Sequence, residues 1–221
     1  MRDQYFVPVC LYPHTKYRTA AGVTDLFEKF QLSQHGYLCV VADRLLVLDR
    51  LVTGRYWSEN SAVIKARKEG EQILKLIRNV ARKLKAHEPG RVVFWDEIER
   101  REDFPDFASA LRTAVLADAT MAAAMDEFVD RRIARFGLGS DRGKERGYER
   151  EYLLSEVCMS VYCTEMLGFF NEIWERPPHP DVPDPLKLLY DQRRNIVSSV
   201  TGRPAARALS FLYKTVDKHK N

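Results

Sequence analysis

Residues 37–42 read Tyr-Leu-Cys-Val-Val-Ala, an unbroken apolar run that ends at Asp43. A strand that is apolar at every position has both faces buried, which is typical of a parallel sheet with helices on each side. Residues 5–11 and 91–95 are similar short apolar runs, and residues 169–174 form a fourth candidate. We expect these runs to be the strands of one central sheet.

The segments between these runs have the spacing of apolar residues that is typical of helices. We expect helices over residues 22–30, 58–86, 104–136 and 148–161. A basic helix is expected at the end of the chain, and no regular structure over residues 137–143 or in the proline-rich stretch 177–185. Strands that alternate with helices predict an α/β fold, a three-layer Rossmann-like parallel sheet flanked by helices, in a single domain over residues 1–221.

The composition is that of a folded protein, with 45% hydrophobic and 30% charged residues and a net charge of +4. No apolar run is long enough to cross a bilayer and the start of the chain has no signal-peptide pattern, so we expect a cytoplasmic protein without membrane contact. The four cysteines (Cys10, Cys39, Cys158 and Cys163) form no CxxC pair. We therefore expect reduced thiols and no metal site. The sequence contains no glycine-rich phosphate loop of the usual kinds, and no cofactor is expected.

Positive charge is concentrated in residues 65–85, which contain eight Lys and Arg residues against two Glu. Five of these cations recur at helical spacing and form one stripe: Lys68, Lys75, Arg78, Arg82 and Lys85. A stripe of cations along a helix matches the phosphates of a nucleic-acid backbone. A solvated helix face has the same pattern, so the charges alone fit both interpretations.

The order of these features resembles the tRNA-dependent cyclodipeptide synthases. That family takes two aminoacyl-tRNAs and makes a cyclic dipeptide, on a fold that resembles the catalytic domain of class I tyrosyl- and tryptophanyl-tRNA synthetases. Its pattern is a strand that ends in a nucleophilic serine, a second strand that ends in Asp, and a long basic helix that contacts tRNA. A Tyr-x-x-x-Glu pair on a helix follows much later, and then a strand with an aromatic residue. The resemblance covers residues 5–178.

In this sequence Cys10 stands where the family has its serine, and Asp43 ends the second strand. Tyr152 and Glu156 match the Tyr-x-x-x-Glu pair, and Trp174 stands near the later aromatic position. The resemblance implies that Cys10 is the nucleophile, that Tyr152 holds the aminoacyl group, and that Glu156 anchors the α-ammonium group and carries a proton. From its residue type alone, a cysteine at the end of a strand is more often a buried, inert thiol.

Several positions depart from the family pattern. Pro8 stands where the family has a glycine, and the loop asparagine is missing, with His14 nearby as a candidate base or proton relay. Trp174 has no phenolic hydroxyl. These departures imply a diverged branch and resemble the fungal branch that builds arginine-containing cyclodipeptides, which implies arginyl-tRNA as one of the two substrates.

The candidate substrate-binding residues are Trp174, Pro8 and the carboxylates Asp43 and Asp96, since a carboxylate pairs well with the guanidinium group of an arginine substrate. Glu165 and Glu172 are further acidic residues near predicted element ends. The candidate tRNA-binding residues are Lys68, Lys75, Arg78, Arg82, Lys83 and Lys85.

Two other functions fit the same residues. One is an aminoacyl-tRNA-dependent transferase that passes a single amino acid to another acceptor. The other is a non-catalytic tRNA-binding module in which Cys10 belongs to the core. A tRNA synthetase is disfavoured, because the His-Ile-Gly-His and Lys-Met-Ser-Lys-Ser signatures are missing.

Overall fold

The structure, a computed structural model, describes residues 4–9, 11, 16–42, 59–85, 91–136, 142–174, 184–205 and 210–213. Five strands form one sheet in the order β3-β2-β1-β4-β5. Their bounds are Gln4–Val9 (β1), Gly36–Val41 (β2), Arg91–Phe94 (β3), Asn171–Trp174 (β4) and Ser210–Tyr213 (β5). All neighbouring pairs are parallel. The predicted parallel sheet flanked by helices is therefore confirmed, and every residue of β2 is buried as its apolar run requires.

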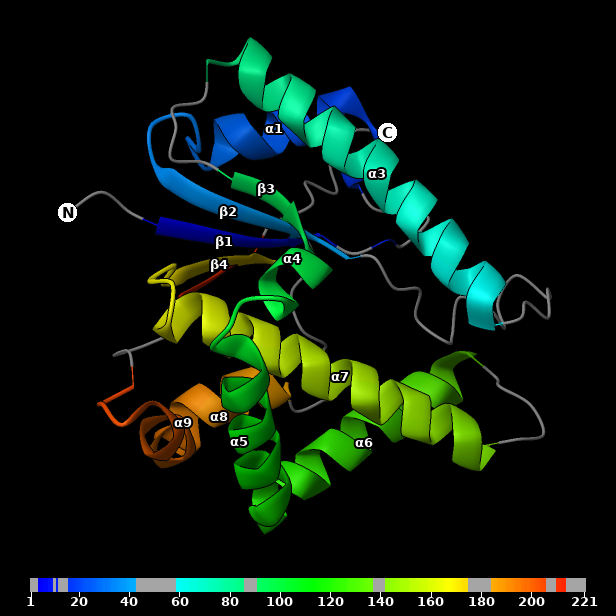
Figure 1. The fold of residues 1–221 in the computed structure, drawn as a ribbon, viewed down its shortest axis with the longest axis vertical. Helices are drawn as coiled ribbons and strands as arrows, with labels where there is room; N and C mark the ends of the chain where they lie inside the picture. The colour runs from blue at the N-terminus through cyan, green and yellow to red at the C-terminus, as the bar shows by residue number, and fades with distance from the viewer. Residues whose placement is uncertain are drawn as a thin grey trace.

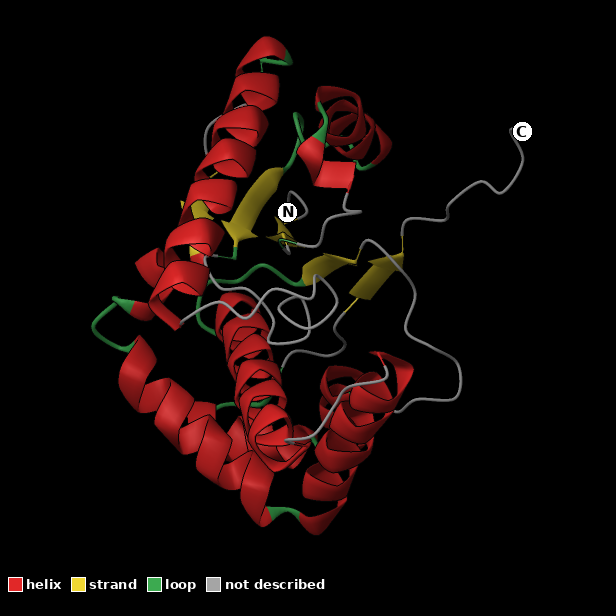
Figure 2. Ribbon diagram, turned by 90° about the vertical axis from the view of Figure 1, so that its right-hand side faces the viewer, coloured by secondary structure: helices red, strands yellow, loops and turns green. Residues whose placement is uncertain are grey.

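The helices lie on both faces of this sheet (Figure 1). A 3₁₀ turn (η1, Lys16–Arg18), α1 (Ala20–Lys29) and α3 (Glu59–Lys83) form one layer. The short α4 (Trp95–Glu99) follows β3 directly. The second layer contains α5 (Phe104–Ala117), α6 (Ala119–Phe136), α7 (Arg142–Glu165), α8 (Pro185–Gln192) and α9 (Arg194–Thr201). Figure 2 shows the strands between the two groups of helices.

Helix α3 packs tightly onto the sheet. Ala66, Ile73, Ile77 and Val80 form its buried face. At Gly70 a Cβ atom would come within 2.9 Å of the Phe94 ring and 3.0 Å of the Ala42 carbonyl oxygen, so only glycine allows this approach of the helix to β2 and β3. The opposite face is therefore left to the basic residues.

The structure corrects three of the expectations. Residues 142 and 143, expected in a loop, begin α7, and α7 continues to Glu165 rather than ending near Val161. The proline-rich stretch ends in a helix, because Pro185 opens α8 and the Asp184 carboxylate caps it by accepting from the Lys187 amide at 2.9 Å. Toward the end of the chain, the short helices α8 and α9 are followed by the strand β5, and residues 214–221, where the final basic helix is expected to end, lie outside the described residues.

Strand β5 reads Ser-Phe-Leu-Tyr and pairs with β4 from Asn171↔Ser210 to Trp174↔Tyr213. Aromatic residues favour strands, but the flanking cations made the segment look helical in sequence. Its pairing with β4, and not its local pattern, decides its conformation.

The strand order places a topological switch beside β1. The chain moves outward from β1 to β2 and β3, and then returns to add β4 on the other side of β1. In parallel α/β sheets, ligands bind in the crevice at the carboxyl ends of the strands at such a point. Cys10 follows β1 directly in the sequence, and Trp174 ends β4.

Candidate active site

Tyr152 and Glu156 lie one turn apart on α7, so they share a face of this helix. The Tyr152 ring packs against Trp95, with ring centroids 5.9 Å apart. Trp95 is the first residue after β3, and its indole N–H donates to Glu99 at 3.1 Å. This contact brings the Tyr-x-x-x-Glu pair to the carboxyl end of the sheet, where the catalytic groups of such folds lie.

One turn beyond Glu156, α7 is fixed to the sheet again. The Ser160 hydroxyl donates to the Glu172 carboxylate in β4 at 3.1 Å, and both residues are buried. Helix α7 also contacts β1. Glu156 therefore lies between an anchor at β3 and an anchor at β4, on the helix that packs under the central strand.

Glu156 is partly buried, and its electrostatic surroundings are unusual. Burial raises the pKa of its carboxyl group from 4.5 to about 7. The Arg132 charge and a hydrogen bond from Tyr152 oppose this rise, and the charges of Glu149 and Asp184 add to it. A carboxyl group that titrates near neutral pH can both accept and return a proton, as a general base and acid must.

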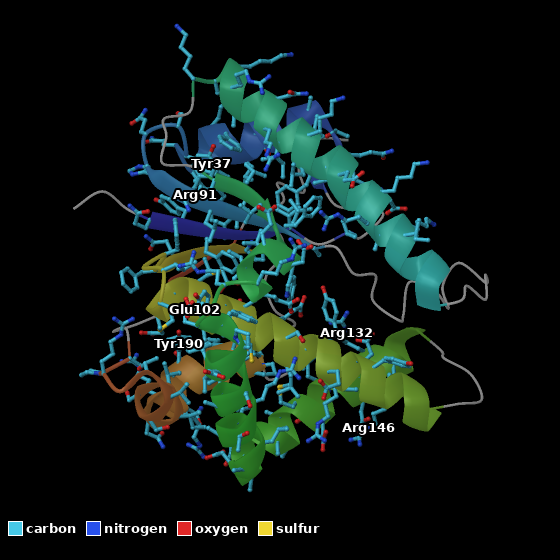
Figure 3. All side chains as sticks on the ribbon, in the orientation of Figure 1. Tyr37, Arg91, Glu102, Arg132, Arg146 and Tyr190 are labelled. Carbon is cyan, nitrogen blue, oxygen red and sulfur yellow. The ribbon has the colours of Figure 1, made fainter. Side chains whose placement is uncertain are left out.

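Arg132 and Glu149 form an ion pair beside this carboxyl group. The Arg132 Nε atom of α6 lies 3.6 Å from the Glu149 Oε2 atom of α7, and Glu149 is 1% exposed. The Arg132 guanidinium also lies over the Phe128 ring at 5.6 Å from its centroid. Figure 3 shows Arg132 beside α7.

Three predicted site residues, Cys10, His14 and Asp43, lie outside the described residues. The segment that follows Cys10 is described at Leu11, which is buried. Arg18 donates to the Leu11 carbonyl at 2.7 Å and to the Glu69 carboxylate of α3 at 2.7 Å. One guanidinium group thus ties the chain just beyond Cys10 to the basic helix.

Pro8 and Trp174 lie on the two strands that flank the switch point. Pro8 pairs with Val40 of β2, and it lies beyond the last described pair of β1 with β4, Phe6↔Glu172. Both predicted substrate-binding positions therefore lie near the carboxyl ends of adjacent strands.

Asp96 is engaged by two guanidinium groups. Its Oδ2 atom accepts from Arg67 of α3 at 3.0 Å and also from Arg100. The Arg67 guanidinium lies over the Phe94 ring at 3.9 Å from its centroid. Asp96 thus links α3 to α4, and its predicted role toward a cationic substrate would compete with these ion pairs.

The basic stripe of α3 is present on the surface of the protein. Lys68, Lys75, Arg82, Lys83 and Lys85 are exposed. No carboxylate of the described part of the chain forms an ion pair with these five cations. Arg78 differs, because its guanidinium donates to the Val92 carbonyl of β3 through two nitrogens, at 3.2 and 2.7 Å. Arg78 therefore fixes α3 to the sheet.

The remaining acidic and thiol candidates are buried. Glu165 accepts from the Tyr190 hydroxyl at 3.1 Å, and Glu172 accepts from Ser160, so both belong to a polar layer between α7, β4 and α8. Cys39 is fully buried, as expected for a core residue. Among the described residues, no group of three His, Cys, Asp or Glu side chains is arranged to hold a metal ion.

The sequence did not identify Trp95, Arg132, Glu149 or Arg18 as parts of this site. Trp95 could have been found, because it is the last residue of the predicted strand 91–95. Arg132 and Glu149 belong to helices joined by a connection outside the described residues, and only their tertiary contact brings them to Glu156. Arg18 acts through a backbone carbonyl, which leaves no pattern in sequence.

No protein-family model and no curated protein sequence matches this chain significantly. Solved structures do match it. AlbC, a cyclodipeptide synthase from Streptomyces noursei, superimposes with a TM-score of 0.65 at 15% identity, over 97% of this chain and 96% of that chain. The fold is that of the cyclodipeptide synthases. A Mycobacterium tuberculosis protein superimposes with a TM-score of 0.66 at 19% identity, over 95% of this chain and 84% of that chain. Its structure was described as demonstrating that cyclodipeptide synthetases are related to type I tRNA synthetases.

No helix in the described ranges is both long and apolar enough to cross a membrane.

Proposed function

We propose that this protein is a cyclodipeptide synthase that forms a 2,5-diketopiperazine from two aminoacyl-tRNAs. The observation that carries the proposal is Glu156, a carboxyl group with a pKa of about 7, paired with Tyr152 at the carboxyl end of the sheet. The same fold in solved cyclodipeptide synthases supports it. Residues 1–221 act as one catalytic domain in this proposal, in the cytoplasm, where aminoacyl-tRNAs are available.

The proposed chemistry begins at Cys10. Its thiolate attacks the ester carbonyl of the first aminoacyl-tRNA; the C–O bond to the ribose breaks, the tRNA hydroxyl leaves with a proton, and an aminoacyl thioester remains. His14 is the proposed base or proton relay for this step. An aminoacyl ester is already activated, so no nucleotide cofactor is required.

Glu156 serves the second step. The α-amino group of an aminoacyl-tRNA is a nucleophile only after its ammonium form has lost a proton. The Glu156 carboxylate accepts that proton, and Tyr152 holds the aminoacyl group. The amine then attacks the thioester, a C–N bond forms, the C–S bond breaks, and the leaving sulfur takes up the proton that the nitrogen loses, which restores the Cys10 thiol. Ring closure repeats this chemistry on the second ester and releases the second tRNA.

The exposed stripe of α3 is the proposed tRNA surface. The phosphate contacts come from Lys68, Lys75, Arg82, Lys83 and Lys85. Arg78 contributes by fixing α3 to β3. Helix α3 is tied to the sequence just after Cys10 through Arg18 and Glu69. Binding of tRNA on α3 therefore places the acceptor end of a substrate near the proposed nucleophile.

Arginine is the proposed side chain of one substrate. Among the charges with the largest effect on the Glu156 pKa, two carboxylates, Glu149 and Asp184, raise it and one guanidinium group, that of Arg132, lowers it. A ligand with a cationic side chain and an α-ammonium group would offset this excess of negative charge. Trp174, Pro8, Asp43 and Asp96 are the other proposed members of the substrate pocket.

Expression in bacteria tests the reaction class. Wild-type protein should release new cyclic dipeptides into the medium, identified by mass spectrometry, and Cys10→Ala should release none. Purified protein given aminoacylated tRNA should gain the mass of one aminoacyl group, and this adduct should be missing in Cys10→Ala but present in the buried-cysteine control Cys158→Ala.

The alternatives give different results in the same experiment. A transferase to another acceptor forms the adduct on Cys10 but releases no cyclic product. A non-catalytic tRNA-binding module forms no adduct, and Cys10→Ala leaves its tRNA binding unchanged. An adduct that persists in Cys10→Ala would place the nucleophile elsewhere.

A further inference from the structure

The ion pair between Arg132 and Glu149 has the geometry of a control element for Glu156. Glu149, Tyr152 and Glu156 share one face of α7, because they are spaced at three and four residues. Arg132 reaches this face from α6 and contacts Glu149. Glu151 and Ser155, on another face of α7, bind Arg112 of α5 instead. The proposed catalytic carboxylate therefore lies on the face of α7 that Arg132 contacts, and not on the face that Arg112 contacts.

We infer that Arg132 is a positioning residue, held in place by Glu149, that sets the protonation state of Glu156 and so the pH range of the reaction. This inference rests on the proposed function for its effect on catalysis, but not for its effect on Glu156 itself.

Contacts with Phe128 and Glu149 help to fix the position of Arg132. Phe128, one turn earlier on α6, lies under the guanidinium, and the buried Glu149 carboxylate pairs with it. Glu149 is almost inaccessible to water, so its charge requires a cation nearby. The pair thus holds Arg132 close to α7 and divides its positive charge between two carboxylates.

The charged and titratable side chains with the largest effect on the Glu156 pKa come from three helices and their ends. Tyr152 and Glu149 come from α7, Arg132 from α6, and Asp184 from the start of α8. Strand β1, which also packs against α7, has no charged side chain in its described residues 4–9. Arg132 is therefore the cation in this set, and its removal leaves Glu156 among carboxylates.

The two partners have opposite effects on Glu156. Arg132 lowers the pKa of the Glu156 carboxyl group, and Glu149 raises it. Loss of Arg132 should move the titration of Glu156 to higher pH. Loss of the Glu149 charge should move it to lower pH, because a like charge that raises the Glu156 pKa disappears. An ion pair too far from Glu156 to act on it predicts no such opposite shifts.

The test is a direct titration of Glu156 by NMR in protein labelled with ¹³C at the glutamate carboxyl groups, with Glu156→Gln to assign the signal. We expect Arg132→Met to raise the midpoint by about one pH unit and Glu149→Gln to lower it by a similar amount. The double variant should titrate close to wild type. Arg146→Met is the matched control, because Arg146 joins the same two helices through Asp126 and Asp130 but is not among the groups with the largest effect on the Glu156 pKa.

If Arg132→Met unfolds the protein, Arg132→Lys keeps the charge and should titrate like wild type, and Glu149→Gln still reports the shift to lower pH. The pH profile of cyclic dipeptide formation should move in the same direction as each midpoint. Midpoints of Glu149→Gln and Arg132→Met that match wild type overturn the inference. A protein that makes no cyclic dipeptide overturns the proposed function but leaves the titration to decide the inference.

Discussion

Glu156→Gln should remove the proposed reaction and make the protein more stable at alkaline pH. The pKa of the Glu156 carboxyl group rises from 4.5 to about 7 in the folded protein, a difference of 7 − 4.5 = 2.5. At about 1.36 kcal/mol per unit, a charged Glu156 costs the folded state at most about 3.4 kcal/mol. Since the side chain keeps some contact with solvent, we expect about 1–2 kcal/mol to be measured.

The sign of this effect with pH follows from proton binding. Below pH 4.5 both the folded and the unfolded state hold the proton, so the carboxyl group has no effect on stability. Between pH 4.5 and 7 the unfolded state has lost the proton and the folded state keeps it, so the wild type loses stability as the pH rises. Above pH 7 the loss is complete. Glutamine never ionises, so the variant does not lose stability in this pH range.

The assay is urea unfolding or thermal melting of both proteins between pH 5 and pH 8. The variant's advantage should grow over this range and reach roughly 2–8 °C in Tm at pH 8. Its rate of cyclic dipeptide formation should fall by about 100-fold or more, because the proton acceptor is lost. Glu151→Gln is the control on the same helix, since Glu151 is exposed and its variant should gain nothing with pH. A stability difference that is constant from pH 5 to pH 8 would refute the raised pKa of the Glu156 carboxyl group.

Two further predictions concern helix α3. Replacement of three exposed cations, Lys68, Lys75 and Arg82, by Ala should weaken tRNA binding. It should also reduce the slope of the logarithm of the tRNA association constant against the logarithm of salt concentration by roughly 2–3. The same change at Arg131 and Lys187, each paired with a carboxylate one turn away, should leave this slope unaltered. An unchanged slope in filter binding would remove α3 from the tRNA surface. Gly70→Ala should lower the stability by about 1–3 kcal/mol through its contact with Phe94 and Ala42, whereas Gly147→Ala, with open space around it in α7, should raise it by roughly 0.5–1 kcal/mol. Equal Tm values for the two glycine variants would show that α3 does not need its close approach.

The sequence predicted the sheet well because its strands are buried on both faces. An unbroken apolar run such as residues 37–42 has few other conformations available in a folded protein, and the structure confirms it as β2. The long α3 was equally clear, since its buried residues recur at helical spacing beside the cations. The end of the chain was not predictable in this way, because β5 is a strand only through its pairing with β4.

The site was predicted in part. The spacing of Tyr152 and Glu156 indicates one helix face, and that arrangement is what the structure has. The surroundings that raise the pKa of Glu156 come from α6 and from the residue before α8, and contacts between helices leave no periodic signal in sequence. For Arg78, the sequence pattern is present but the side chain has a different role. Its spacing puts it in the cation stripe, but its guanidinium binds a strand carbonyl.

The strand order has a consequence for synthesis of the chain. Strand β1 gains its first neighbour when residues 36–41 are made, but its second neighbour begins only at Asn171, which is 171 − 41 = 130 residues later. At about 5–20 residues per second a ribosome needs roughly 6–26 s for that length. During this time the strand that precedes Cys10 has one unpaired edge, the kind of surface on which growing chains associate. Slower translation lengthens this interval, so the yield of correctly folded protein should depend on chaperones and on growth temperature.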